Sequence, residues 1–396
     1  MKIVVVGQGG REAALAHHFT GHGHQVVVTP GRDGIPGSQR IDPLELDADL
    51  FVIGPDLEVV QGLADKLRAQ GKHVYAPGRQ GGQLEGSKVF MKAFLKRSGV
   101  ATADYVVFAQ GHHQSARHYL ESSHGPWVIK TDYLAAGKGV LVTSDRQEAI
   151  ADAEAKLTNG AIVIEAVLPG HEVSVMAITN GRQYRLLPLA QDYKRVGTGD
   201  QGPNTGGMGA FAPAVDLVDP EAVQAVVQSI IHELNRQEID YRGTLYIGLM
   251  VDGPLVRVLE INVRFGDPET QVQLPLLQND LAQILLAAAQ GHDLPPLETK
   301  GSAVTVVMAA PGYPEDLRLD DEIDGLETAS QTPRVHILHS GTSQNPDGTY
   351  CTAGGRVLNV VGMGETIEEA RSNAYKAVAR IHWTGEHHRT DIGLAH

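Results

Sequence analysis

The chain has 396 residues, enough for two or three domains with well-formed cores. Its net charge of −14 disfavours a general binder of nucleic acid or anionic membranes, although a local basic cleft can still hold phosphates. The single cysteine, Cys351, excludes an intrachain disulfide framework, and no apolar run approaches the roughly 18 residues of a membrane span. We therefore expect a cytoplasmic protein without nucleic-acid or membrane partners.

The N-terminal region alternates short apolar strands with helices, which predicts an α/β domain with an open parallel sheet. The carboxyl edge of such a sheet is the end at which nucleotides or phosphates bind. The expected strands cover residues 1–10, 25–29 and 49–53, and the expected helices cover 11–19 and 57–70.

The glycine turn GQGGRE at residues 7–12 follows the first strand. It does not match the dinucleotide-binding fingerprint, because Glu12 occupies the position of the third glycine and no acidic residue stands at the end of the strand at 26–29. A nicotinamide-dependent dehydrogenase is therefore disfavoured. Two interpretations remain: a turn whose backbone donors bind one phosphate at the helix start, or a tight turn without a ligand.

A glycine-rich stretch at 76–83 predicts a loop before a helix over 87–97. From Tyr105 the pattern changes to short elements, with strands expected over 127–131, 139–143, 161–167 and 172–179 and a helix over 146–157.

Two lysines bracket a loop of small residues, LAAGKGV at 134–140, between two of these strands. Lys130 ends the first strand and Lys138 lies in the loop, so the loop can close over a polyphosphate. It is not a Walker A loop, because no Ser or Thr follows Lys138 and no helix begins there. A β-turn with solvated lysines is the other interpretation.

The strand at 162–168 ends in a turn, where free backbone groups can bind an adenine edge or simply mark an exposed edge strand. Glu172 beyond it can meet a ribose hydroxyl or face water. The polar, glycine-rich stretch 192–209 is predicted to be a functional loop. Its alternating acids, bases and amides suit a site for an amino acid and a phosphate.

The sequence around Asp252-Gly253 predicts a β-hairpin, since that dipeptide favours a two-residue turn between two apolar strands. On the second strand, Glu260, Asn262 and Arg264 alternate onto one face. A carboxylate and an amide oxygen suit Mg²⁺, which takes the rest of its ligands from water and substrate phosphates. Arg264 can hold a phosphoryl oxygen with two donors. The alternative is a Glu–Arg pair on the wet face of an ordinary sheet.

Around and beyond this hairpin the sequence predicts long helices, a linker and a second group of strands. Helices are expected over 220–237, 280–290 and 367–381, a linker over 292–296, and strands over 303–310, 335–338 and 355–362.

The order of these motifs resembles that of the phosphoribosylamine–glycine ligases, also called glycinamide ribonucleotide synthetases, which are ATP-grasp enzymes of purine synthesis. GPNTGGMG at 202–209 and RFGDPETQ at 264–271 are together highly specific. Further matching stretches run nearly end to end: GGRE at 9–12, LEGSK at 84–88, HSGT at 339–342, GGRVL at 354–358 and DIG at 391–393.

The resemblance implies a Rossmann-like pre-ATP-grasp domain at 1–97, a two-part ATP-grasp core at 98–296 with a mobile subdomain at about 115–187, and a small C-terminal domain at 297–396. It implies that ATP phosphorylates glycine and that the amine of 5-phosphoribosylamine then attacks the acyl phosphate. ATP and Mg²⁺ or Mn²⁺ are the implied cofactors, and we expect a monomer or a weak homodimer.

The resemblance also implies roles for individual residues. Glu260 and Asn262 would bind the metal, and Arg264 and Lys138 would be catalytic. ATP would be held by Lys88, Lys130, Lys138, Glu165, Val167 and Glu172. Glycine and the ribosylamine would be held by Gly10, Arg11, Asp192, Lys194, Asn204, Thr205, Gly206, Asp267, Pro268 and Glu269.

The chain departs from the family pattern mainly on its N-terminal side. Ala13 stands where a histidine is usual, GPDLEV at 54–59 replaces Gly-Pro-Glu-Ala-Pro-Leu, and the domain is shortened before Asp49. Lys130 is followed by Thr-Asp-Tyr rather than Ala-Asp-Gly, and Ala166 replaces a usual acid. The substituted Ala13 and Asp56 motivate an alternative: a ligase of the same fold that joins a different amine or acid in a specialised pathway. A non-catalytic nucleotide-binding module is a third hypothesis, but it predicts loss of the Glu260 strand, which is present.

Overall fold

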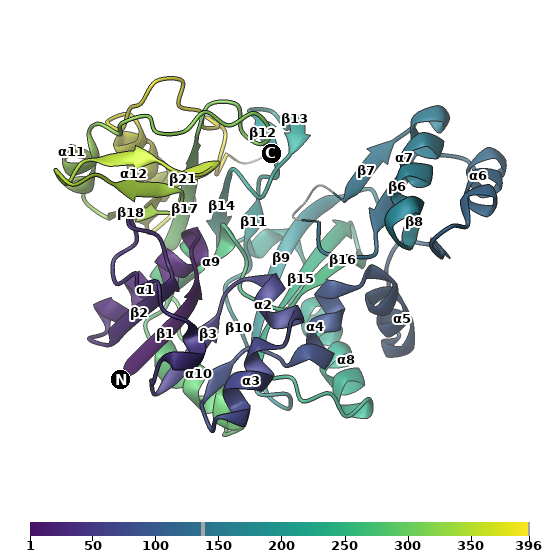
Figure 1. Ribbon diagram of the computed structural model, residues 1–396, viewed down its shortest axis with the longest axis horizontal. Coiled ribbons are helices and arrows are strands. Elements are labelled where there is room, and N and C mark those ends of the chain that lie inside the picture. Colours follow the sequence, from purple (N-terminus) through teal and green to yellow (C-terminus); the bar gives the residue numbers. More distant parts are fainter. Residues whose placement is uncertain (136–138, 395–396) are drawn as a thin grey trace.

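The computed structural model describes residues 1–135 and 139–394. Within these residues the strands form three four-stranded sheets, one five-stranded sheet and two two-stranded ribbons. Figure 1 shows the N-terminal and C-terminal parts side by side, the central sheet beside them, and a separate lobe projecting away. No helix in the described ranges has the length and apolar character needed to cross a membrane.

The N-terminal sheet is parallel, as its apolar strands predict, with the order β2-β1-β3-β4. Its strands are β1 (Lys2–Gly7), β2 (Gln25–Pro30), β3 (Leu50–Ile53) and β4 (Val74–Tyr75). Helix α1 (Gly10–Gly21) begins directly after β1 and packs its buried face, which includes Leu15 and Phe19, into the core of this domain. The glycine turn at the carboxyl end of β1 therefore lies at the edge where ligands bind in such sheets.

Two predictions in this region were wrong in detail. The single helix expected over 57–70 is divided into α2 (Asp56–Val60) and α3 (Leu63–Ala69), because Gly62 between them has a φ of 80°. The loop expected over 76–83 instead runs into helix α4 (Arg79–Gly86). A Cβ at Gly82 would lie 3.3 Å from the Cα of Val60, so this glycine lets two helices approach closely. Helix α5 (Lys88–Ser98) follows, with the Ser87 hydroxyl capping its start.

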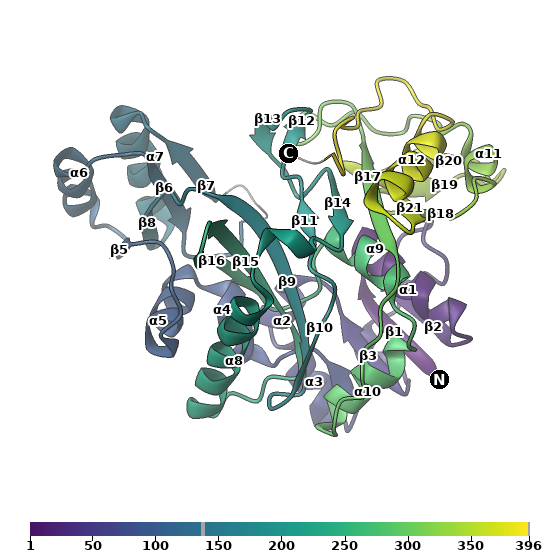
Figure 2. The same cartoon turned by 180° about the vertical axis from the view of Figure 1, so that it is seen from behind.

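The central sheet is antiparallel, in the order β10-β9-β15-β16. Its strands are β9 (His171–Thr179), β10 (Tyr184–Leu186), β15 (Gly243–Asp252) and β16 (Leu255–Asn262). The hairpin turn is confirmed, with Gly253 at a φ of 56°. One face is covered by α8 (Pro220–Arg236), whose apolar residues share a core with those of the sheet (Figure 2).

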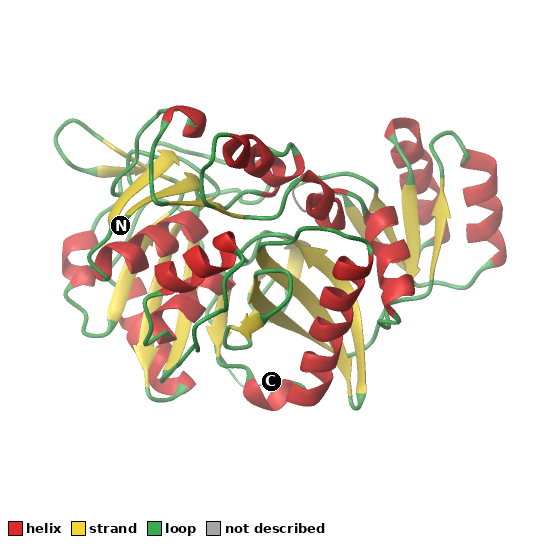
Figure 3. Cartoon of the chain, turned by 90° about the horizontal axis from the view of Figure 1, so that it is seen from below, coloured by secondary structure: helices red, strands yellow, loops and turns green. Residues whose placement is uncertain are grey.

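The projecting lobe has its own sheet, ordered β5-β8-β6-β7, and its own small core. Figure 3 shows its two helices on one side of the strands, apart from the rest of the molecule. The elements are β5 (Tyr105–Phe108), α6 (His113–Ser122), β6 (Trp127–Thr131), β7 (Val140–Thr143), α7 (Arg146–Asn159) and β8 (Ile162–Ala166). The next strand, β9, already belongs to the central sheet.

The C-terminal sheet has the order β11-β14-β17-β21-β18 and includes two strands from the middle of the chain. Its strands are β11 (Gln191–Asp192), β14 (Gly209–Ala212), β17 (Ser302–Ala309), β18 (Val335–His339) and β21 (Arg356–Gly364). Helix α12 (Ile367–Val378) packs on β21 and β17. The sheet thus joins the polar stretch 192–209 to residues beyond 297.

The remaining elements connect these layers. Within 192–209, the expected loop contains the ribbon β12 (Arg195–Gly197) and β13 (Gln201–Asn204). The others are β19 (Thr342–Gln344), β20 (Tyr350–Thr352), α9 (Glu269–Gln273), α10 (Leu281–Gln290), α11 (Leu326–Ser330), and the short 3₁₀ turns η1 (Pro43–Glu45), η2 (Val215–Leu217) and η3 (Leu274–Leu276).

Candidate active site

The structure brings together the three polar side chains at the end of β16. The Asn262 amide nitrogen donates to Glu260 Oε1 at 3.4 Å, and Arg264 Nη2 donates to Asn262 Oδ1 at 3.2 Å. Arg264 follows the last residue of β16, but its side chain lies on the same face as those of Glu260 and Asn262. The alternation of side chains along β16 is the local cause of this arrangement.

Lysines from three other segments of the chain lie near Glu260. Lys88 Nζ lies 3.9 Å from Glu260 Oε2, and Lys194 Nζ lies 3.8 Å from Oε1. Lys130 Nζ donates to the backbone carbonyl of Leu259 at 3.4 Å. Burial by itself would raise the pKa of Glu260, but Lys194, Lys88, Lys130 and Arg264 together hold that pKa below its usual value. The carboxylate is therefore ionised at neutral pH.

Glu165, on β8, lies in the same area and binds two lysines. Its Oε2 is 3.0 Å from Lys92 Nζ and 3.1 Å from Lys130 Nζ, and its Oε1 is buried without a hydrogen-bond partner. Burial lowers the pKa of Lys92 to about 8, although Glu165 opposes that shift. Lys92 was not predicted from the sequence. Its spacing of one helical turn from Lys88 was the available signal, because residues i and i+4 share a helix face.

Arg264 is held by the buried carboxylate of Glu85, for which no role was predicted from the sequence. Glu85 Oε1 lies 3.0 Å from Arg264 Nη2, and Glu85 Oε2 accepts the backbone N–H of Val263 at 2.8 Å. Burial raises the pKa of Glu85, while Arg264 opposes that shift. This buried acid fixes both the guanidinium and the backbone at the end of β16.

The stretch after β11 reaches the same centre through Lys194, which forms an ion pair with Glu172 as well as with Glu260. Thr205 contacts the backbone of Lys194. Its hydroxyl and its backbone N–H both donate to the Lys194 carbonyl, at 2.9 and 2.7 Å. Asn204 is exposed beside it. The polar stretch is therefore tied directly to the Glu260 centre.

Arg356, at the start of β21, holds this stretch against the segment after β16. Its Nη1 donates to the carbonyls of Gly206 at 2.7 Å and Asp267 at 3.0 Å, and its Nη2 pairs with Asp267 Oδ2 at 3.2 Å. Although burial acts in the opposite direction, Arg356 and Arg11 lower the pKa of Asp267. Arg356 had no predicted role, since nothing in the local sequence shows which of the arginines reaches the site.

Two further acids, Asp192 and Glu269, lie close enough to interact. Asp192 Oδ1 is buried without a hydrogen-bond partner, and burial and then Glu269 raise the pKa of Asp192 well above its usual value. Glu269 is buried and accepts hydrogen bonds from Ser174 Oγ and the Tyr246 hydroxyl, each at 2.9 Å. Pro268 lies beside Asp192: a Cβ added at Gly207 would lie 2.4 Å from Pro268 Cδ and 2.7 Å from Asp192 Oδ1.

The start of α1 lies against the opposite side of this region. Arg11 Nε pairs with Glu12 Oε1 at 2.5 Å, and its Nη1 donates to the Phe265 carbonyl at 3.1 Å. The Gly9 N–H is taken by Glu12 at 2.7 Å. A Cβ at Gly10 would lie 2.4 Å from Asn359 Nδ2, so Gly10 leaves room for the Asn359 side chain of β21. The turn joins two domains beside Asp267.

Val167 and Lys138, two predicted ATP contacts, have no described interaction with the residues above. Val167 follows the end of β8 and is 36% exposed, so its backbone is near the surface of the lobe. Lys138 lies outside the described residues.

The residues at the end of β16 fit a magnesium or manganese ion. The described residues contain no group of three or more His, Cys, Asp or Glu side chains arranged to hold a metal. Glu260 and Asn262 offer one ionised carboxylate and one amide oxygen beside a cluster of cations. Such a small oxygen set matches an ion that takes its other ligands from substrate phosphates and water, rather than from a protein cage.

The fold and this site define an ATP-grasp ligase. Models of the phosphoribosylglycinamide synthetase N, ATP-grasp (A) and C domains match residues 1–85, 86–270 and 303–395. The chain therefore belongs to the phosphoribosylamine–glycine ligase family.

The similarity to known proteins extends over nearly the whole length of the chain. A curated relative from Leifsonia xyli, named phosphoribosylamine–glycine ligase, is 41% identical over 99% of each chain. A relative of the same name from Streptomyces coelicolor is 42% identical over 99% of this chain and 98% of its own. The crystal structure of phosphoribosylamine–glycine ligase from Thermotoga maritima is 33% identical and superposes with a TM-score of 0.87 over 99% of this chain and 100% of that one. N5-carboxyaminoimidazole synthetase from Staphylococcus aureus, 17% identical with a TM-score of 0.66 over 95% of this chain and 96% of its own, shares the fold.

Proposed function

We propose that the protein uses ATP to join glycine to 5-phosphoribosylamine, giving glycinamide ribonucleotide, ADP and phosphate in purine synthesis. The observation that carries this proposal is the convergence of Lys88, Lys130, Lys194 and Arg264 on the polar end of β16. A cationic centre with two oxygen ligands suits a triphosphate and its metal ion. The full-length family likeness supports glycine and the ribosylamine over a different acid or amine.

The reaction needs activation because a carboxylate repels nucleophiles and has no good leaving group. A glycine carboxylate oxygen attacks the γ-phosphorus of ATP, and the bond to ADP breaks. The amine of phosphoribosylamine then attacks the carbonyl of glycyl phosphate, and phosphate leaves with the bonding electrons as the amide forms. The amine loses one proton, which the released phosphate takes up. These steps depend mainly on positioning and charge stabilisation.

On the ATP side, Lys88, Lys130 and Lys138 would contact the phosphates. Glu165 and Val167 would bind adenine at the end of β8, and Glu172 would meet the ribose. The Glu165 carboxylate is already held by Lys92 and Lys130, which supports a role in fixing the phosphate-binding lysine while the nearby backbone contacts the base.

Glu260 and Asn262 would hold Mg²⁺ or Mn²⁺, which would neutralise charge on the transferring phosphoryl group. Arg264 would bind an oxygen of the same group with its planar pair of donors. Glu85 keeps Arg264 in place, since its other oxygen is fixed by the backbone of Val263.

Glycine would enter with its ammonium group toward Asp192 and Glu269. The unpartnered, buried Oδ1 of Asp192 supports this assignment, because a cation there would relieve the cost of an ionised acid. The ribosylamine would lie between the stretch 204–206, residues 267–268 and the start of α1. Gly10 and Arg11 would approach its 5-phosphate, with Arg11 close to Asp267. An unstable acyl phosphate also needs a site that excludes water.

Purified protein supplied with ATP, glycine and freshly generated phosphoribosylamine tests the proposal. We expect the amide product together with equal amounts of ADP and phosphate. ATP-dependent turnover with another amine, and none with phosphoribosylamine, would instead support the ligase with a different substrate.

The setting of the enzyme is also part of the proposal. The single cysteine supports a reducing, cytoplasmic location. A monomer or a weak homodimer is predicted, which sedimentation over a range of protein concentrations would measure.

A further inference from the structure

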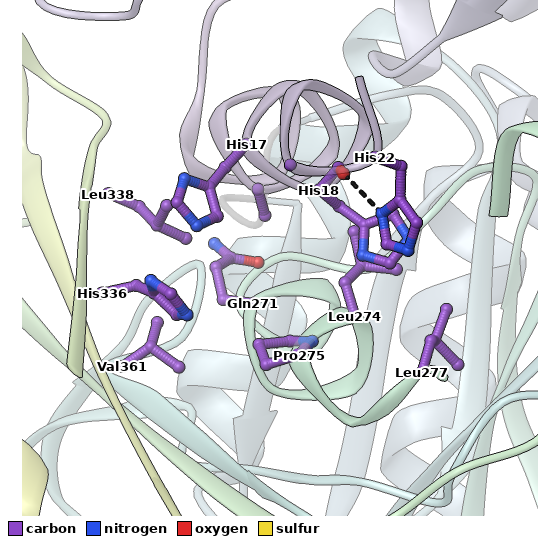
Figure 4. A pocket seen from close by; sticks show the side chains of 12 residues that line it. His17, His18, His22, Gln271, Leu274, Pro275, Leu277, His336, Leu338 and Val361 are labelled. Carbon is purple, nitrogen blue, oxygen red and sulfur yellow. Dashed lines mark hydrogen bonds between the residues drawn. The ribbon is translucent and has the colours of Figure 1, made fainter. Parts of the chain in front are cut away.

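Polar side chains also cluster outside the site described above. At one such cluster, His17 of α1 lies against His336 of β18 (Figure 4). The two ring centroids are 4.5 Å apart, so these histidines pack α1 onto β18. Another cluster surrounds Arg389, in the segment that follows α12. It contacts the polar stretch 192–209 of the proposed substrate site.

Among the described residues, Arg389 is the largest whose side chain is fully buried. Its Nε and Nη2 donate to the two carboxylate oxygens of Asp391, at 2.8 and 2.7 Å. Its Nη1 donates to Asp200 Oδ1 at 2.7 Å and to the Arg195 carbonyl at 3.0 Å. The guanidinium carbon also lies 4.9 Å from the centre of the Tyr193 ring. A buried charge is costly unless it is paired and hydrogen-bonded, so these contacts fix the guanidinium in one place.

The two residues that follow hold the turn of the β12–β13 ribbon. The Thr390 N–H donates to the Thr198 hydroxyl at 3.1 Å, and Asp391 Oδ2 accepts the Gly199 N–H at 2.8 Å. Asp200 completes the turn with a φ of 55°, a backbone conformation that is costly for a residue with a side chain. Its ion pair with the buried guanidinium holds it there.

Residues 387–391 form a strap that is anchored on its other side to the C-terminal sheet. The backbone groups of His387 and Ala309 exchange two hydrogen bonds, of 3.1 and 2.7 Å, at the end of β17. Arg371 of α12 donates to the Thr390 carbonyl at 2.6 Å. The strap therefore transmits the position of the C-terminal sheet and α12 to the ribbon.

The ribbon follows directly on residues that are proposed to bind glycine. Tyr193, whose ring lies against Arg389, stands between Asp192 and Lys194. Because side chains alternate along an extended chain, Asp192 and Lys194 point away from the strap and toward the site. The Tyr193 N–H donates to the Gly209 carbonyl at 3.0 Å, which ties this backbone to β14.

We propose that Arg389 is a positioning residue for glycine binding: it fixes the backbone on both sides of Lys194 and thereby the place of the Asp192 carboxylate. The Lys194 side chain is itself held by Glu172 and Glu260, independently of the strap. The effect of Arg389 therefore falls on glycine binding and much less on phosphoryl transfer. This consequence rests on the proposed function, whereas the contact between the strap and the ribbon does not.

Arg389→Lys tests the proposal, because lysine keeps the charge but cannot bind both oxygens of Asp391 and the Arg195 carbonyl together. We expect faster amide hydrogen exchange in residues 195–204 of the variant, a measurement that needs no activity. We expect the KM for glycine to rise about tenfold, while kcat and the KM for ATP change by less than about twofold.

The possible failures are distinguishable. Unchanged hydrogen exchange in the ribbon would overturn the strap. An active wild type with an unchanged KM for glycine in Arg389→Lys would overturn the positioning role alone. Wild-type protein that forms no amide from glycine would instead refute the proposed function.

Two further variants separate this role from general stability. Asp200→Asn removes one charge of the cluster at an exposed position, and asparagine tolerates the same backbone conformation, so the KM for glycine should rise about threefold. Arg380→Lys is the matched control, since Arg380 follows α12 but donates to the Thr328 carbonyl and the Thr332 hydroxyl, at 2.9 and 3.1 Å. It should change neither the exchange in the ribbon nor the KM. An equal effect of Arg380→Lys would contradict the proposal.

Discussion

The two ends of the candidate active site are built differently. At the end of β16, the ion pairs of the described residues join five cations to four carboxylates: Lys88, Lys92, Lys130, Lys194 and Arg264 to Glu85, Glu165, Glu172 and Glu260. Beside α1, Arg11 pairs with Glu12 and Arg356 with Asp267, one to one. The first end has an excess of positive charge, and the second is balanced.

This difference separates two tasks. Excess cations gathered on shared acids form a preorganised field for a polyphosphate, where charge stabilisation is the main contribution to catalysis. Balanced pairs that also bind backbone carbonyls, as Arg356 does with Gly206, instead fix the shape of a pocket. We therefore expect changes at the β16 end to lower kcat, and changes at the α1 end to act mainly on the KM of the ribosylamine.

The largest effect is expected for Glu260→Gln. The variant keeps the shape of the side chain but removes the charge that holds the metal ion and balances Lys88 and Lys194, so kcat should fall on the order of 10³-fold. Steady-state assays over a range of Mg²⁺ concentrations measure this loss. Glu298→Gln, at an exposed position, is the matched control and should retain full activity.

Arg264→Lys should lower kcat on the order of 10²-fold with little change in the KM for glycine. Lysine keeps the charge but cannot supply the planar pair of donors that binds Glu85 and a phosphoryl oxygen together. Rapid-quench measurement of ADP formation separates this step from product release. Equal activity of the lysine variant and wild type would show that Arg264 acts only as a point charge.

Much of the β16 end could be predicted from the sequence because it depends on local order. Side-chain alternation and the Asp252-Gly253 turn are enough to place Glu260, Asn262 and Arg264 together. Glu85, Lys92 and Arg356 were not assigned, since they reach the site from other elements. Glu85, for example, bonds the backbone of Val263, which is 178 positions away in the sequence. No local pattern specifies such a contact.

The fold, like the site, was predictable where it depends on local sequence and not where it depends on distant contacts. The parallel N-terminal strands and the hairpin were predicted from apolar patterns, whereas the break at Gly62 depends on a backbone conformation that the helical pattern conceals. The two strands that join the C-terminal sheet from the middle of the chain, β11 and β14, could not be foreseen either, because β14 pairs with β17, which is distant in the chain.

At the α1 end, Arg356→Ala should raise the KM for phosphoribosylamine on the order of tenfold, with a smaller change in the KM for ATP. The variant removes the contacts that join Gly206 to Asp267 and leaves Asp267 without its closest cation. Initial rates with each substrate varied in turn measure the difference. A larger effect on ATP than on the ribosylamine would overturn the division between the two ends.

The smallest expected effect is on stability. Asp192 has a raised pKa in the folded state, so the unfolded state, with a value near 3.8, releases the proton at lower pH. The free energy of unfolding therefore decreases as the pH rises from about 3.8 toward the pKa of Asp192 in the folded state. Asp192→Asn, which stays neutral, should stabilise the free protein by about 1 kcal/mol at neutral pH and by less at pH 4. Urea unfolding at the two pH values measures this. A gain that is larger at pH 4 would contradict the assigned protonation.

The central claim is that the β16 end transfers a phosphoryl group from ATP to a glycine carboxylate. Glycine labelled with oxygen-18 in its carboxylate tests this directly, with mass spectrometry of the released phosphate. We predict one labelled oxygen in the phosphate for each amide formed. Unlabelled phosphate accompanying amide formation would show that no glycyl phosphate forms and would contradict the proposed reaction.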